Sequence, residues 1–119
     1  MAGNVLVNCA YGKNNPEEAT VAFIAASAAV TRSAATAVFV TSDAVRLATP
    51  DYADDIQAEG YEPLKVFLDK FLAKGGKLWV CPACANARGI VQEDLINGAT
   101  IDGVPTILDF LEDGGITLM

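Results

Sequence analysis

Two cysteines and an arginine stand close together in this sequence and could do chemistry as a group. Residues 77–90 read KLWVCPACANARGI, so Cys81 and Cys84 form a C-x-x-C pair and Arg88 follows them. If Pro82 opens a helix after a strand, helical spacing places the three side chains on one face, at i, i+3 and i+7. The positive end of a helix and a nearby cation both stabilise thiolate, the nucleophilic form of cysteine. The pattern therefore predicts a reactive thiol site in which Arg88 tunes the charge.

Plainer interpretations of the same residues stay open at this point. A cysteine pair can be half-buried at a strand–helix turn without any reactivity, because free cysteine packs as a small hydrophobic residue. Arg88 can equally be a solvated arginine or part of an interface. The C-P-x-C context favours the reactive interpretation, since a proline in the first helical turn places the first cysteine at the helix start.

The composition excludes several kinds of chemistry. The chain has 119 residues, a formal net charge of −7 and no histidine. Without histidine there is no Ser-His-Asp or Cys-His catalysis, and the commonest metal ligand is missing. The acidic balance argues against nucleic acid and anionic membranes as partners. We expect no cofactor and no bound metal.

Length and cysteine content indicate a small intracellular domain. One domain spanning residues 1–119 is expected, because a chain of this size builds a single core. No apolar run reaches the roughly 18 residues that a membrane-spanning helix needs, and no basic segment leads into an apolar N-terminal stretch. Three cysteines, an odd number, do not form a disulfide framework. These features predict a cytoplasmic protein.

Strand and helix signals alternate along the chain. Short buried strands are expected at about residues 4–8, 35–41, 78–80, 99–101 and 116–119. Helices are expected at about residues 16–32, 62–73, 82–87 and 103–112, with Asn15 and Asp102 as caps, and Ser42 or Asp43 should cap a further short helix. This alternation predicts an α/β fold: a Rossmann-like, single-domain three-layer sandwich with a mainly parallel sheet of about five strands and helices on both faces.

Sulfur-bearing and polar residues follow three of the expected strands. Cys9 ends the first, Asp43 lies shortly after the second, and Cys81 directly follows the third. Sites in open parallel sheets form at the carboxyl ends of the strands. Cys9 and Asp43 are therefore candidate neighbours of the C-x-x-C pair, with the strand order deciding how close they come. For Cys9, a buried and inert thiol is the simpler interpretation.

Several segments together resemble the DsrE/DsrF-like sulfur-relay family. The most specific is C-x-x-C-x-x-A-R-G-I at residues 81–90, followed by E-D-L-I-x-G-A at residues 93–99. T-S-D-A-V at residues 41–45 and E-G-Y-E-P-L-K-x-F-L-D-K-F-L-x-x-G-G at residues 59–76 also fit this family, as do the helix after Asp102 and the short final strand. The resemblance extends over nearly the whole chain.

This resemblance implies a small α/β domain that assembles into homo-oligomers, often trimers or hexamers. In sulfur-transferring members, a cysteine at the position of Cys81 carries sulfur as a persulfide, and others have a second cysteine where Cys84 stands. It therefore implies a sulfur-relay protein that works with a sulfur donor and an acceptor protein. Many members have no assigned activity, so enzymatic activity, as a sulfurtransferase-like carrier, stays open.

A thiol–disulfide oxidoreductase is the main alternative function. W-V-C-P-A-C at residues 79–84 is similar to a thioredoxin active site, and G-V-P-T at residues 103–106 is similar to its cis-proline loop. Only 20 residues separate Cys84 from Pro105, too few for the helix, strand and helix between these parts of thioredoxins. Pro105 also fits better at a helix start. Dithiol chemistry at the C-x-x-C pair does not depend on that fold.

Two further interpretations involve no transfer of sulfur. A zinc site would take four ligands, of which the C-x-x-C pair supplies two, with Cys9 and Asp43 or a second subunit completing it. A non-enzymatic oligomeric binding or scaffold protein would have incidental thiols. Thiol reactivity discriminates among these interpretations, because a carrier or an oxidoreductase needs a depressed pKa at Cys81 or Cys84 and a scaffold does not.

Overall fold

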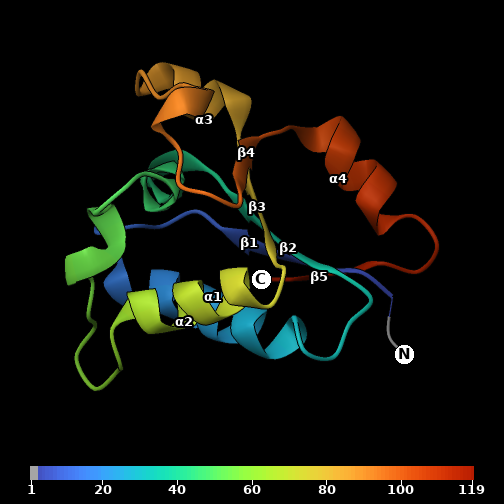
Figure 1. Ribbon diagram of the computed structural model, residues 1–119, viewed down its shortest axis with the longest axis horizontal. Coiled ribbons are helices and arrows are strands. Elements are labelled where there is room, and N and C mark those ends of the chain that lie inside the picture. The colour runs from blue at the N-terminus through green and yellow to red at the C-terminus, as the bar shows by residue number, and fades with distance from the viewer. Residues whose placement is uncertain (1–2) are drawn as a thin grey trace.

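A five-stranded sheet in which all strands are parallel forms the centre of the molecule. The structure is a computed structural model that describes residues 3–119. The strands are β1 (Val5–Cys9), β2 (Thr36–Val40), β3 (Lys77–Val80), β4 (Ala99–Ile101) and β5 (Ile116–Leu118). Their spatial order is β4-β3-β2-β1-β5, so β1 and β5 pair side by side although they lie far apart in the sequence (Figure 1).

Helices cover both faces of this sheet. The α-helices are α1 (Pro16–Ala29), α2 (Leu64–Ala73), α3 (Pro82–Ala87) and α4 (Val104–Leu111), and the 3-10 helices are η1 (Ser42–Ala48), η2 (Tyr52–Asp55) and η3 (Gln92–Asp94). Figure 1 shows α1 and α2 side by side on one face, with α4 on the other. The predicted α/β sandwich with a parallel sheet is confirmed. Of the helices in residues 3–119, none combines the length and apolar character that a membrane crossing needs.

Aromatic pairs anchor the helices to each face of the sheet. Phe23 of α1 and Phe71 of α2 meet edge to face, with ring centroids 6.2 Å apart and planes at 75°. On the opposite face, Trp79 of β3 meets Phe110 of α4, with centroids 5.0 Å apart and planes at 83°. Such pairs add to the stabilisation from buried area. The Trp79–Phe110 pair ties β3 to α4, and β3 ends at Val80, directly before Cys81.

The start of α1 agrees with the prediction from the sequence, whereas its end does not. The helix starts as predicted, because the Asn15 side chain accepts the N–H of Glu18 at 3.2 Å. It ends at Ala29, a few residues before the predicted end. The Ser33 hydroxyl donates to the carbonyl of Ala29 at 3.0 Å and lies 2.6 Å from the Thr36 hydroxyl. These contacts turn the chain into β2.

Two predicted helix caps are wrong. Thr41, and not Ser42 or Asp43, occupies the N-cap position of η1, without a capping hydrogen bond from a side chain. Gly103 occupies that position in α4. In both cases the carboxylate has another partner. Asp102 accepts the Thr106 hydroxyl at 2.6 Å and the N–H of Gly103 at 3.1 Å, and Asp43 accepts a hydrogen bond from Arg88, directly after α3.

Candidate thiol site

The junction of β3 and α3 carries both cysteines of the C-x-x-C pair. Cys81 donates its N–H to the carbonyl of Val40 in β2 at 3.0 Å, so sheet pairing continues up to the N-cap of α3. Pro82 lies in the first turn, where no N–H is needed. Arg88 is the C-cap, and Gly89 follows it in the left-handed conformation, at a φ of 68°. The predicted strand–helix turn is therefore confirmed.

Cys81 and Cys84 are free thiols that lie close together. Both are half-buried and pack against the core on the face of α1 and α2. Ala85 is buried, and its carbonyl accepts the N–H of the buried residue Ile90 at 2.9 Å, which fixes the end of α3. The two thiols are thus accessible from solvent and held in place relative to each other.

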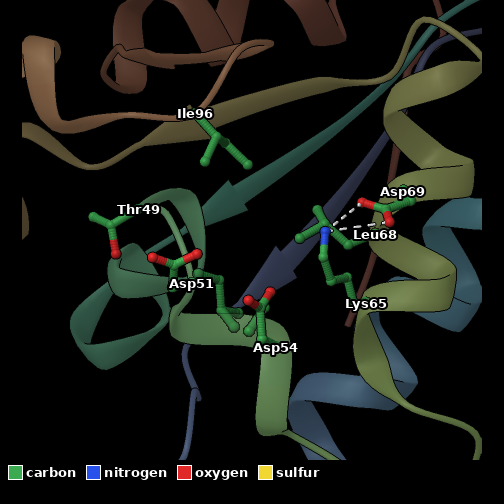
Figure 2. A pocket seen from close by; sticks show the side chains of 9 residues that line it. Thr49, Asp51, Asp54, Lys65, Leu68, Asp69 and Ile96 are labelled. Atoms are coloured by element: carbon green, nitrogen blue, oxygen red, sulfur yellow. Dashed lines mark hydrogen bonds and ion pairs between the residues drawn. The ribbon is translucent and has the colours of Figure 1, made fainter.

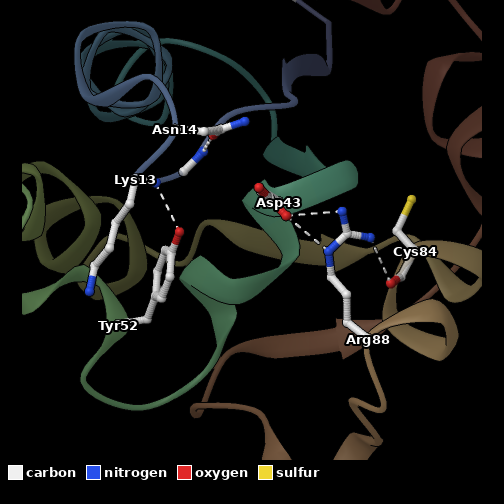
Figure 3. A network of polar contacts seen from close by, with 7 residues as sticks. Lys13, Asn14, Asp43, Tyr52, Cys84 and Arg88 are labelled. Carbon is white, nitrogen blue, oxygen red and sulfur yellow. Dashed lines mark hydrogen bonds and ion pairs between the residues drawn. The ribbon is translucent and has the colours of Figure 1, made fainter.

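A carboxylate from the end of the neighbouring strand holds Arg88. Arg88 donates to Oδ1 of Asp43 from Nε at 3.1 Å and from Nη2 at 3.0 Å (Figure 3). It also donates from Nη1 to the carbonyl of Cys84 at 3.2 Å. Asp43 lies in η1, shortly after β2, and β2 pairs with β3. The structure thus brings Asp43 and Arg88 together beside Cys84, at the edge of the sheet expected from the sequence.

The groups around Cys84 lower the pKa of its thiol. The largest cause is a hydrogen bond from the Cys81 thiol; the main-chain N–H of Ser42 and the positive charge of Arg88 act in the same direction, against partial burial. Ser42 has a φ of 50°, in the left-handed region, which costs a non-glycine residue roughly 1–2 kcal/mol. Backbone strain of this kind gathers at functional sites.

The pKa of the Cys81 thiol is shifted in the opposite direction. Burial, and then its hydrogen bond with Cys84, raise the pKa of the Cys81 thiol. Its place at the N-cap of α3 therefore does not lower the pKa of Cys81, and of the two thiols that the sequence offered as the one with a depressed pKa, Cys84 is favoured. α3 has only 6 residues, so its dipole is weak, whereas Cys84 has a thiol, an N–H and a guanidinium beside it. These opposite shifts favour Cys84 as the nucleophile of the pair and Cys81 as the thiol that assists it.

Cys9 lies apart from this pair. It is the last residue of β1, and β2 separates β1 from β3. Its side chain is 3% exposed, and its thiol donates to the carbonyl of Tyr11 at 3.4 Å. Burial raises the pKa of the Cys9 thiol to about 11, which confirms a buried, protonated thiol. Among residues 3–119, no three cysteine, aspartate or glutamate side chains are arranged to hold a metal ion, so Cys9 and Asp43 do not complete a metal site within one chain.

Two hollows lie elsewhere on the molecule. The one in Figure 2, of about 50 Å³, is lined by residues of η2 and α2 and by their neighbours, among them Asp51, Asp54 and Asp69. It has room for only a few water molecules, and Lys65 neutralises Asp69 at 3.3 Å. The other, of about 180 Å³, lies beside Cys9 at the carboxyl end of β1. Neither is lined by the C-x-x-C pair.

Reasoning from the sequence missed Ser42 as part of the site. Ser42 was expected only as a helix cap, yet its main-chain N–H contributes to the lowered pKa of the Cys84 thiol. Its side chain is exposed and does not carry this role. The one available signal was its place directly after a buried strand, where sites form in parallel sheets.

The fold and the site together define a class of protein: a parallel α/β domain with a cysteine pair at the carboxyl edge of its sheet. The chain belongs to the DsrE/DsrF-like family, whose profile matches residues 4–118. It is also 31% identical over 100 residues to the uncharacterized protein MJ0760 of Methanocaldococcus jannaschii. That match covers 84% of this chain and 36% of the relative, so the chain spans about a third of the relative's length.

Solved structures share the fold. The ychN protein from E. coli is 22% identical, with a TM-score of 0.67, over 99% of this chain and 100% of that chain. The protein of unknown function MTH1491 from Methanobacterium thermoautotrophicum is 15% identical, with a TM-score of 0.66, over 99% of this chain and 98% of that chain. At these identities the similarity concerns the arrangement of strands and helices. It confirms the DsrE-like fold.

Proposed function

We propose that this protein is a sulfur-relay carrier that holds sulfur as a persulfide on Cys84, with Cys81 as the second thiol of the site. The placement of the Cys84 sulfur carries this proposal, because the Cys81 thiol, the Ser42 N–H and Arg88 all stabilise negative charge there. A persulfide carrier needs an accessible thiolate to accept sulfur, and both thiols are half-buried at the surface. Membership of the DsrE/DsrF-like family supports the same function.

In the accepting step, the Cys84 thiolate attacks the outer sulfur of a persulfide donor, R–S–SH. The bond between the two donor sulfurs breaks, a new S–S bond forms to Cys84, and the donor leaves as its thiolate, R–S⁻. One S–S bond replaces another, so the step needs no external oxidant. The persulfide on Cys84 ionises by losing its proton to water, and Arg88 and the Ser42 N–H stabilise the resulting charge.

Two releasing steps are open to such a persulfide. A thiolate of an acceptor protein can attack the outer sulfur, taking it as a new persulfide and returning Cys84 as thiolate. Alternatively, Cys81 loses its proton and attacks the Cys84 Sγ, which forms a Cys81–Cys84 disulfide and expels HS⁻. In this second case Cys81 is oxidised and the outer sulfur is reduced, and a dithiol reductant must then restore both thiols.

Assembly into a trimer or hexamer, in the cytoplasm, belongs to the same proposal. On α4, Val104 and Leu108 are 56% and 61% exposed, and on the edge strand β5, Ile116 is 54% exposed. Exposed apolar side chains on an unpaired strand edge and its preceding helix are typical of interaction surfaces. Sedimentation velocity tests the proposal: a trimer or hexamer is expected at micromolar concentration, and a monomer contradicts it.

Intact-mass analysis tests the sulfur-carrier function. Reduced protein is incubated with cysteine persulfide or a polysulfide, desalted and weighed, with and without a later reductant. The wild type is expected to gain the mass of one sulfur atom, which the reductant removes. Cys84→Ala should lose this gain, and Cys9→Ala, a matched control at the buried thiol, should keep it. No gain from either donor in the wild type and in Cys81→Ala, which cannot form the Cys81–Cys84 disulfide, contradicts the function. A gain that persists in Cys84→Ala contradicts the assignment of the carrier.

A thiol–disulfide oxidoreductase is the second candidate, favoured by the closeness of two free thiols. Pro105 lies in the first turn of α4, so the G-V-P-T segment starts a helix and does not form a loop like that of thioredoxin. The same mass analysis separates the two functions. Loss of two hydrogens in the wild type indicates an oxidoreductase only if Cys81→Ala also gains no sulfur, because the second releasing step of a carrier leaves the same disulfide. Ordinary alkylation profiles for both thiols indicate a binding or scaffold protein.

A further inference from the structure

Gly12 packs between the loop that follows β1 and the main chain at the thiol site. It is buried, and a Cβ added to it would lie 2.6 Å from Tyr52 Oη and 3.1 Å from the carbonyl oxygen of Asp43. The first of these distances is shorter than real Cβ contacts, and the second meets the main chain, which gives way less easily than a side chain. Glycine therefore allows the loop to lie directly against the Asp43 carbonyl.

Tyr52 is the other half of this contact. Its Oη accepts the N–H of Lys13 at 2.8 Å, and its half-buried ring packs against the main core (Figure 3). The Lys13 ammonium lies 4.7 Å from the centroid of the ring and pairs with Asp55 at 3.1 Å. Cation–π contacts of this kind add roughly 0.5–1 kcal/mol at exposed sites. Tyr52 is thus fixed by η2 and by the loop, and its hydroxyl lies against Gly12.

The contact reaches the thiol site through Asp43. The carbonyl of Asp43 faces Gly12, and its carboxylate accepts both hydrogen bonds from Arg88. Arg88 in turn donates to the carbonyl of Cys84 at 3.2 Å. A displacement of the Asp43 main chain would therefore move the cation that lies beside the Cys84 thiol.

The contact at Gly12 can also act on the thiol site through the strained residue Ser42. Ser42 has a φ of 50°, and its main-chain N–H helps to lower the pKa of Cys84. Its side chain is exposed, so burial of that side chain does not hold the conformation. A conformation of this kind persists only where its surroundings fix it. On one side, Thr41 donates its N–H to the carbonyl of Cys9 at 3.0 Å. On the other side, Asp43 lies against Gly12.

We propose that Gly12 and Tyr52 are positioning residues of the thiol site, which hold the main chain of Ser42 and Asp43 where it serves the reactive cysteine. The inference deepens the proposed function and rests on it, since it names residues that set the state of the carrier thiol. Neither residue lies among the groups that act directly on Cys84. Their effect is therefore on the charge of the nucleophile, and direct contact with a sulfur donor is not required.

Few other charged groups could shift the pKa of the Cys84 thiol. The groups that face the reactive thiol are Cys81, the Ser42 N–H, and Arg88 with its carboxylate partner. The nearby ion pair of Lys13 and Asp55 has side chains that are 49% and 75% exposed, so solvent and salt screen it. A change at Gly12 or Tyr52 should therefore act on the thiol through the main chain and Arg88.

The pH dependence of alkylation tests this inference on the full chain. The rate at which iodoacetamide modifies Cys84 is followed by site-resolved mass spectrometry across neutral and alkaline pH, in the wild type, Gly12→Ala and Tyr52→Phe. Both variants are expected to raise the midpoint by about half a pH unit, which lowers the rate at neutral pH about threefold. Tyr61→Phe is the matched control, because Tyr61 donates its hydroxyl to Glu17 at an exposed position.

The outcomes separate the positioning role from the proposed function. Midpoints like the wild type's in both variants, with folding confirmed by circular dichroism, overturn the inference, and so does an equal shift in Tyr61→Phe. If Gly12→Ala does not fold, Tyr52→Phe decides alone, since it removes one hydroxyl only. Sulfur uptake by the wild type is measured in parallel. Absence of uptake contradicts the carrier function, whereas unshifted midpoints contradict the positioning role.

Discussion

Arg88 and Asp43 lie 45 positions apart in the sequence and are joined through one carboxylate oxygen, at 3.1 Å from Nε and 3.0 Å from Nη2. The same guanidinium donates to the carbonyl of Cys84 at 3.2 Å. Because these three contacts fix the planar group, its charge stays beside the C-x-x-C pair instead of moving through solvent. Asp43, in η1 shortly after β2, thus fixes a cation at the C-cap of α3.

Replacing Arg88 with glutamine removes this fixed charge and nearly preserves the length of the side chain. We expect the pKa of Cys84 to rise and its alkylation at neutral pH to slow about threefold to tenfold. The side chains of Arg88 and Asp43 are 24% and 39% exposed, so the loss of stability should stay below about 1 kcal/mol. Arg46→Gln, the same change of charge at an exposed residue of η1, is the control. Equal alkylation rates in the two variants would show that the charge of Arg88 does not act on Cys84.

Truncating Cys81 to alanine removes the largest cause of the lowered pKa of Cys84. We expect this pKa to rise, and Cys84 to react more slowly with iodoacetamide at neutral pH. The reciprocal variant, Cys84→Ala, should lower the pKa of Cys81, because Cys84 contributes to its rise. Site-resolved alkylation against pH measures both effects. Faster alkylation of Cys84 in the absence of Cys81 would contradict the proposed hydrogen bond between the thiols.

Because the thiol of Cys9 is buried, we expect the protein to lose stability at alkaline pH. Burial raises its pKa from 9.0 to about 11, so the unfolded chain releases this proton first as the pH rises. The contribution to stability is therefore fully present below pH 9.0 and is lost as the pH rises through about 11, by roughly 2–3 kcal/mol in total. Urea unfolding of the wild type and Cys9→Ala at several pH values measures it. The alkaline decline should be smaller in Cys9→Ala, and equal declines count against burial of the thiol.

The packing around Gly76 leaves no room for one more carbon atom at the start of β3. A Cβ on Gly76 would lie 2.3 Å from the ring of Phe71, which is fully buried. Gly76→Ala should therefore lower the free energy of unfolding by about 1–3 kcal/mol. In Gly103→Ala, the new Cβ would lie 3.7 Å from Pro82 and Pro105, an ordinary contact, and the loss should be below about 1 kcal/mol. Similar losses in chemical denaturation would mean that Phe71 is not tightly packed.

The order of strands and helices could be predicted because local sequence signals mark each element along the chain. The apolar repeat of α2, the Asn15 cap of α1 and the glycines that end helices each act within a few residues. The shared face of the C-x-x-C pair and Arg88 follows from helical spacing alone. Asp43 could be placed at the same edge from the rule for parallel sheets.

The chemistry at the two thiols could not be predicted in the same way. It depends on β2 lying beside β3, which brings Ser42 and Asp43 to the cysteine pair, and strand order is a property of the whole fold. It also depends on the left-handed backbone of Ser42, which no residue type at that position signals. For this reason the sequence did not distinguish Cys81 from Cys84 as the thiolate, whereas the lowered pKa of Cys84 and the raised pKa of Cys81 favour Cys84.

The position of the transferred sulfur tests the central claim most directly. Wild-type protein is exposed briefly to less than one equivalent of cysteine persulfide, its free thiols are blocked, and it is digested with trypsin. Cleavage after Lys77 and Arg88 releases both cysteines in one peptide, in which fragment ions between Cys81 and Cys84 locate the additional sulfur. We predict that it lies on Cys84. Sulfur found on Cys81 alone or on Cys9, or on none of the three cysteines, would contradict the claim that Cys84 is the carrier.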